Sequence, residues 1–218
     1  MRHRRTSSQP PSAADALFAS IEKLSPLSPT ARSAWEKLLS PRSFGAGEWL
    51  LRAGEQAHWS FFVARGLVRE FYVSDSGEEH TRVFVPEGQF TGSLLDLISS
   101  QPAVTWLQAL EPTDTLAFRY REFEALCDRF PDLQRCARRF AESLYARKAK
   151  REYEMLALSA QQRHAQWLRD HAALDGRIRR QMLASYLGIT PEHLSRLRRG
   201  PRRVPWRCLI NVNARRAQ

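Results

Sequence analysis

Near the end of the sequence, Glu192, Ser195 and Arg196 lie within one helical turn of each other, so a helix would present them together. An ionised glutamate can accept a hydrogen bond from N4 of cytosine, and an arginine can donate two hydrogen bonds to O6 and N7 of guanine. A serine hydroxyl can contact a base or a phosphate. These residue types favour the reading of DNA base edges. Catalysis is the weakest interpretation, because no Ser, His and Asp set, metal-ligand spacing or phosphate-binding loop stands out.

The surrounding residues have the pattern of two short helices joined by a very tight turn. Gly188 can adopt the left-handed conformation that ends a first helix, and Ile189 can fill the turn from inside. Thr190 is a good N-cap for a second helix, with Pro191 at its first position. The predicted inner faces consist of Ile178, Met182, Leu183 and Leu187 in the first helix and Leu194 and Leu197 in the second. The residues that we expect to contact DNA are Thr190, Glu192, His193, Ser195, Arg196 and Arg199.

An alternative is that residues 188–199 form an ordinary amphipathic helix end with a basic, solvated face. Residues 147–218 contain 17 of the 34 Lys and Arg residues but only 5 of the 23 Asp and Glu residues. This localised positive charge favours DNA, RNA or an anionic membrane as partner over a small substrate. Glu192 would weaken a purely electrostatic binder, whereas a base reader gains discrimination from it. We therefore expect a DNA-reading helix-turn-helix.

Between residues 42 and 119 the sequence changes to short β-type segments bounded by glycines. These segments are residues 49–51, 58–66, 67–73 and 80–88. Asp75-Ser76-Gly77 has the composition of a hairpin turn, and residues 105–120 predict further strands. Two short helices are predicted before them, over residues 16–39. The pattern indicates a compact antiparallel barrel or roll that these helices cap.

Helical periodicity returns after Arg121, and a long helix is predicted over residues 131–157. Its apolar residues recur every three to four positions, at Leu133, Ala137, Phe140 and Leu144. This narrow stripe fits packing on the roll alone or pairing with a second subunit, and we expect a dimer because a two-fold protein matches a palindromic site. Ser159 and Gln162 have capping-box spacing, so a new helix is expected from about Ala160, with a hinge before it.

Residues 1–15, rich in Arg, Ser, Pro and Ala, predict a flexible arm.

The rest of the composition argues against membrane, disulfide-rich and metal-binding proteins. No stretch approaches the roughly 20 apolar residues of a membrane span, and no signal peptide is evident, so we expect a cytoplasmic protein without a membrane partner. The three cysteines, Cys127, Cys136 and Cys208, form no Cys-x-x-Cys pair. We therefore expect neither a disulfide framework nor a metal site.

The chain resembles the CRP/FNR family of bacterial transcription regulators, that of the cyclic-AMP receptor protein and the oxygen regulator FNR. The segments LRAGEQAHWSFFVARGLVREFYVSDSGEEHTRVFVPEGQFTGS and LASYLGITPEHLSRLRR carry the resemblance, which covers roughly residues 16–200. It implies an α+β fold, in which an antiparallel β-roll of the cyclic-nucleotide-binding type, a double-stranded β-helix, occupies residues 16–130. A dimerisation helix at residues 131–157 and a winged helix-turn-helix at residues 158–218 would follow.

The resemblance also implies roles for individual residues. The FNR-like branch of the family reads bases with an E-x-x-S-R arrangement, which falls here on Glu192, Ser195 and Arg196. The resemblance therefore implies recognition of a TTGA-type half-site by these three residues.

The ligand cassette is where the sequence departs from the family. Cyclic-AMP binders use a Gly-Glu pair for the ribose and an Arg-Ser pair for the cyclic phosphate, whereas this chain has Gly92-Ser93 and Ala103. The charge-assisted contact to phosphate is missing, so cyclic AMP is not expected. No cysteine precedes Cys127, which argues against an iron-sulfur cluster. A pocket at Gly92, Ser93, Leu94 and Thr105 would bind another small molecule or be filled by Leu94, Leu97 and Ile98.

Two classes of function remain. The first is a dimeric, sequence-specific DNA-binding transcription regulator under the control of a small-molecule effector other than cyclic AMP, with double-stranded DNA, a second copy and RNA polymerase as partners. The second is a ligand-sensing module that acts through protein partners and uses the helix-turn-helix as a docking bundle. The tail after Gly200 leaves room for a short wing near residues 207–212, with arginines for phosphates at 202, 203, 215 and 216.

Overall fold

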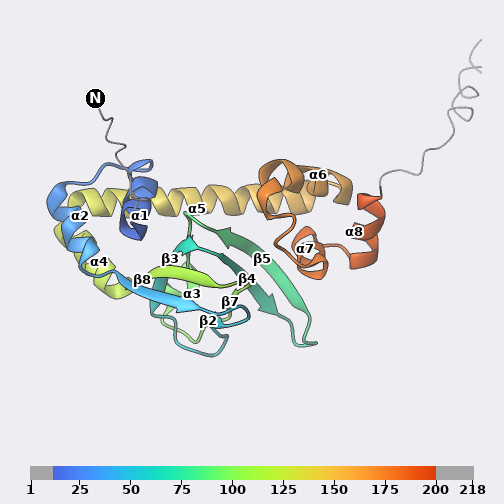
Figure 1. Ribbon diagram of the computed structural model, residues 1–218, viewed down its shortest axis with the longest axis horizontal. Helices are drawn as coiled ribbons and strands as arrows, with labels where there is room; N and C mark the ends of the chain where they lie inside the picture. The colour runs from blue at the N-terminus through green and yellow to red at the C-terminus, as the bar shows by residue number, and fades with distance from the viewer. Residues whose placement is uncertain (1–11, 200–218) are drawn as a thin grey trace, which may run out of the picture. The chain divides into compact units, whose positions relative to one another are not determined.

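The computed structural model describes residues 12–199, which fall in two compact units, Met1–Glu152 and Tyr153–Gln218 (Figure 1). The expected wing and the first eleven residues of the expected arm lie outside the described residues. Helix α5 (Pro131–Ala157) crosses the division and has the bounds that the sequence predicted for the long helix. The division falls inside α5, five residues before the boundary at 158 that the sequence suggested.

Two four-stranded antiparallel sheets form the centre of the first unit. Their strand orders are β1-β8-β3-β6 and β2-β7-β4-β5, so strands that are neighbours in a sheet are mostly distant in the chain. The strands are β1 (Ser40–Phe44), β2 (Trp49–Leu51), β3 (Trp59–Arg65), β4 (Leu67–Val73), β5 (Glu79–Pro86), β6 (Phe90–Thr91), β7 (Trp106–Ala109) and β8 (Thr113–Arg119). The predicted antiparallel roll and the α+β class are confirmed.

Local turn chemistry explains the longest hairpin of the roll. Strands β4 and β5 pair from Leu67 with Pro86 to Val73 with Glu79. The chain reverses at the predicted turn, where Gly77 has a φ of 80° and donates its N–H to the Ser74 carbonyl. A residue with a side chain rarely adopts that φ, which is why glycine stands there.

A cluster of aromatic and aliphatic side chains joins the helices of the first unit to the roll. The helices are α1 (Ala13–Glu22), α2 (Pro29–Glu36), α4 (Tyr120–Arg129) and the first half of α5, and Figure 1 shows α1, α2 and α4 gathered at one end of the roll. Trp35 is 2% exposed and its ring contacts those of Phe18, Phe90, Phe118 and Phe123. Burial of apolar rings thus fixes these helices on the roll.

The first helix begins inside the segment that the composition predicted as a flexible arm. Ser12 caps α1, because its hydroxyl accepts a hydrogen bond from the Asp15 N–H. Residues 13–15 are therefore helical, and Leu17 and Phe18 in the next turn are fully buried. Ser12 and Asp15 are therefore the polar residues of a helix N-terminus rather than of a disordered arm.

The second unit consists of the end of α5 and a group of short helices. These are α6 (Ala160–Asp170), the 3-10 turn η1 (Ala172–Leu174), α7 (Arg180–Leu187) and α8 (Pro191–Arg198). The predicted capping box is present, since Ser159 and Gln162 each bond the other's backbone N–H. Trp167, Leu183, Leu187 and Leu194 form the buried face of the bundle. Among the described helices, none is long and apolar enough to span a membrane.

Candidate nucleic-acid interface

The turn between α7 and α8 has the geometry that the sequence predicted. Gly188 ends α7 in the left-handed conformation, with a φ of 65°, and the Ile189 N–H bonds the Ala184 carbonyl. Thr190 caps α8, since its hydroxyl accepts a hydrogen bond from the His193 N–H at 3.2 Å. The inward Leu194 is fully buried against the bundle. Two helices joined by one glycine and one cap define a helix-turn-helix, in which α8 holds the place of the recognition helix.

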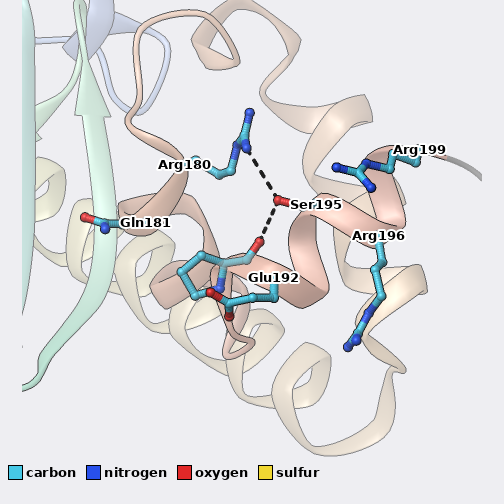
Figure 2. Close-up of a pocket in the computed structure, with 7 residues that line it drawn as sticks. Arg180, Gln181, Glu192, Ser195, Arg196 and Arg199 are labelled. Carbon is cyan, nitrogen blue, oxygen red and sulfur yellow. Dashed lines mark hydrogen bonds between the residues drawn. The ribbon is translucent and has the colours of Figure 1, made fainter.

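Most of the predicted contact residues lie together on the outer side of α8. Glu192, Arg196 and Arg199 are exposed, as is the cap residue Thr190, whereas His193 and Ser195 are half-buried. The structure places a groove of about 710 Å³ at this face, and Figure 2 shows the residues that line it. They are Arg180, Gln181, Pro191, Glu192, Ser195, Arg196 and Arg199.

Sequence reasoning missed two residues of this groove, Arg180 and Gln181, which lie in the first turn of α7. Arg180 donates from Nη1 to Ser195 Oγ at 3.4 Å, while Ser195 Oγ donates to the Pro191 carbonyl at 2.9 Å (Figure 2). The sequence feature that could have identified them is their position: two polar residues follow Arg179 at the start of a helix whose inner face is apolar. With its proton committed to Pro191, the Ser195 oxygen is oriented to accept rather than to donate.

Glu192 carries a charge at the front of the recognition helix. Hydrogen bonds from its own backbone N–H and from the Thr190 hydroxyl lower its pKa, and the nearby positive charge of Arg196 adds to the effect. The side chain is therefore ionised at neutral pH and acts only as a hydrogen-bond acceptor. The groove thus combines three guanidinium groups with one fixed acceptor, a set that can distinguish base edges.

A buried histidine on α6 lies within electrostatic reach of the end of α8. His164 on α6 is 8% exposed and its Nε2 atom has no hydrogen-bond partner. Arg198 at the end of α8 forms an ion pair with Asp175, and both charged groups act on His164. Burial, followed by the positive charge of Arg198, lowers the pKa of His164, although Asp175 raises it. The folded unit therefore favours the neutral form of the imidazole.

In the first unit, residues of the predicted effector pocket belong to a buried cluster of hydrogen-bonded polar groups. Ser93 and Thr105 are buried and lie together, because Thr105 Oγ1 bonds Ser93 Oγ at 3.0 Å. Asp96 on α3 (Leu94–Ser99) is 2% exposed and accepts hydrogen bonds from the N–H groups of Val104 and Thr105, at 3.2 and 3.3 Å. A carboxylate thus occupies the backbone donors that follow Ala103.

The apolar filling that the sequence offered as one alternative is present only in part. Leu97 is buried, but Ile98 is 53% exposed and does not fill the roll, while Leu94 is half-buried. Gly92 is required by its backbone, since its φ is 124° and an added Cβ would lie 3.0 Å from the Trp59 carbonyl oxygen. Sequence reasoning missed Asp96 because one acidic residue among apolar ones is normally solvated.

A second polar network joins β4, β5 and β6. Glu70 on β4 is 5% exposed, forms an ion pair with Arg82 at 2.6 Å and accepts a hydrogen bond from the Thr91 hydroxyl at 2.8 Å. A buried carboxylate needs such partners to remain ionised. Within residues 12–199, no cluster of three metal-ligating side chains is present. Cys127 and Cys136 are free thiols, of which Cys127 is half-buried and Cys136 is buried.

Similarities to known proteins agree with this arrangement. Residues 41–130 match the model of the cyclic nucleotide-binding domain family. The transcriptional activator protein Anr of Pseudomonas aeruginosa is 26% identical over 171 residues, which are 72% of this chain and 68% of Anr. The regulator CLP of Xanthomonas campestris has a TM-score of 0.64 at 18% identity, covering 79% of this chain and 90% of CLP. FixK2 of Bradyrhizobium japonicum has a TM-score of 0.62 at 19% identity, covering 74% and 83%.

A roll of the cyclic nucleotide-binding type followed by a long helix and a helix-turn-helix defines the class of this protein. Residues 41–130 form a domain of the cyclic nucleotide-binding type, and the chain as a whole is similar to regulators of the CRP/FNR family, as its motifs indicated. The predicted resemblance is therefore confirmed.

Removal of the buried carboxylate in the roll tests its structural role. Asp96→Ala leaves the N–H groups of Val104 and Thr105 without their acceptor, at a cost of about 1 to 3 kcal/mol in the free energy of unfolding. Glu36→Ala, which removes an exposed carboxylate from α2, is expected to change it by less than about 0.5 kcal/mol. Urea unfolding of both variants measures the difference, and equal stabilities would contradict the role of Asp96.

The buried histidine predicts a pH dependence of the second unit. The pKa of His164 is lower in the folded than in the unfolded state, so the stabilisation is complete above the unfolded value of about 6.5 and declines as the pH falls below it. Urea unfolding at pH 8 and pH 5.5 should show this loss, and His164→Leu should reduce it. The matched variant His58→Leu, at an exposed site, should retain the full loss; the opposite order of the two variants would refute the assignment.

Proposed function

We propose that this protein is a sequence-specific DNA-binding transcription regulator that acts as a homodimer. The observation that carries the proposal is the groove at α8, where Arg180, Arg196 and Arg199 surround an ionised Glu192. Arginine grips guanine and a carboxylate accepts from cytosine, so the set suits direct reading in the major groove. The excess of basic residues after residue 147 supports binding to the phosphates on either side.

The outer face of α5 supports the dimer. Tyr145 is 75% exposed and Leu156 is 81% exposed, and the exposed Ala149 lies between them on the same helical face. Their separations of four and seven residues are those of a coiled-coil seam. A second copy of this helix would bury these side chains, and the resulting two-fold symmetry matches a palindromic operator.

The polar groups inside the roll disfavour one class of effector, a cyclic nucleotide. Asp96 already occupies the N–H groups of Val104 and Thr105, and Ala103 offers no positive charge to a phosphate. A cyclic phosphate would therefore meet a carboxylate instead of a guanidinium, so we propose that cyclic AMP does not control this protein. We also propose RNA polymerase as a partner, because the relative Anr is named a transcriptional activator.

Base reading by Arg196 is tested by substitution. Arg196→Ala is expected to weaken binding to the preferred DNA site by about 1 to 3 kcal/mol and to relax the preference at one base position in each half-site. Fluorescence anisotropy with the preferred site and with single-base variants of it measures both effects.

The matched control is Arg169→Ala, which removes the same charge from an exposed position on α6. This variant should keep the base preference of the wild type, even where a lost phosphate contact lowers its affinity. An Arg196→Ala variant that loses affinity equally on all sequences would show that Arg196 serves only as a charge. Failure of the wild type to bind any DNA at low salt would favour the alternative of a module that acts through proteins.

The dimer is tested on the exposed face of α5. Leu156→Glu places a charge in the proposed seam on both subunits, and the protein is expected to elute as a monomer in size-exclusion chromatography with light scattering. The control is Leu95→Glu on α3, where the Leu95 side chain is 56% exposed. This variant should leave the dimer intact. A wild-type monomer at micromolar concentration, or a Leu156→Glu dimer, would contradict the proposal.

A further inference from the structure

One arginine in the second unit contacts the ends of two helices and has no part in the groove. Arg163 on α6 donates from Nε to the Leu187 carbonyl at 2.9 Å and from Nη1 to the Leu158 carbonyl at 2.5 Å. Leu187 is the last residue of α7, and Leu158 follows the last residue of α5. The same guanidinium therefore bonds the C-terminal end of the long helix and the start of the turn that leads to α8.

The chemistry of these two acceptors explains why an arginine suits this position. The last carbonyls of a helix lack intrahelical partners and carry the negative end of the helix dipole. A guanidinium remains charged and holds its N–H groups in a rigid planar fork, so two acceptors bound to it have fixed directions. A lysine ammonium would supply the charge without that geometry.

A second contact joins the same segments. A Cβ added at Gly188 would lie 2.6 Å from Met155 Cε, so the end of the Met155 side chain, on α5, packs directly against the glycine of the turn. The compact second unit accordingly begins at Tyr153, within α5, rather than after it. The joint at Leu158 and Ser159, where the sequence suggested a hinge, is held on one side by Arg163 and on the other by the capping box.

We infer that Arg163 is a positioning residue that fixes the last turn of α5 to the helix-turn-helix and thereby sets the separation of the two half-sites that the dimer reads. The inference rests on the proposed function. The recognition helices of such a dimer must reach major grooves about 34 Å apart, so a rigid connection to the shared helices selects one spacing. A loose connection would tolerate several spacings without changing how each half-site is read.

The experiment compares wild type, Arg163→Gln and Arg163→Lys on palindromes with the selected spacing and with one or two base pairs inserted. We expect each insertion to weaken wild-type binding by at least about tenfold, because a displaced half-site loses several base contacts at once. For both variants this spacing penalty should fall to less than about threefold, whereas the cost of a mismatched base should remain as in the wild type. Arg169→Ala, the control on α6, should keep the full spacing penalty.

Two other outcomes would overturn the role of Arg163 without contradicting the proposed DNA binding. Variants that keep the wild-type spacing penalty would overturn the role of Arg163. Variants that lose base discrimination together with spacing selectivity would show that Arg163 only stabilises the unit, which also overturns it.

If the wild type binds no DNA, the proposed function fails, and hydrogen exchange on the same proteins still tests the contact. Faster exchange of the amides of residues 156–163 in Arg163→Gln, with unchanged exchange in α7, would support the joint that Arg163 fixes. Equal exchange in the two proteins would overturn it.

Discussion

The left-handed turn at Gly188 and the cap at Thr190 determine what the second unit can do. Gly188 ends α7 and Thr190 starts α8 two residues later, so the direction of the recognition helix follows from the backbone of three residues. Leu194 anchors the inner side of that helix in the bundle, and its outer side presents the groove. The turn also contributes to the electrostatics of Glu192, because the Thr190 hydroxyl is one of the donors that lower its pKa. A change in the turn would therefore alter packing, direction and electrostatics together.

Acidic groups have opposite roles in the two units. In the roll, Asp96 and Glu70 are buried and satisfied by backbone N–H groups, Thr91 and Arg82, so they hold the interior together. On α8, Glu192 is exposed, and hydrogen bonds and the charge of Arg196 lower its pKa. Burial decides between these roles, because a buried carboxylate without partners is costly whereas an exposed one keeps its acceptor sites for other molecules.

Local patterns predicted the parts of the molecule that local chemistry determines. The hairpin at Gly77, the capping box at Ser159 and the turn at Gly188 each follow from a few neighbouring residues, and the structure has all three. Asp96 could not be found in this way, because its partners Val104 and Thr105 are eight and nine residues away on a separate segment. Arg163 was missed for the same reason, since Leu187 lies 24 residues further along the chain. Strand order in the two sheets likewise depends on long-range pairing that periodicity does not contain.

The central claim is that the groove at α8 reads bases as half of a symmetric dimer, and selection from a pool of random double-stranded DNA by the purified protein tests it most directly. The account predicts enrichment of a palindrome with two half-sites at one fixed spacing, unchanged by added cyclic AMP. Enrichment of no common sequence, or of a single half-site without a symmetric partner, would contradict it.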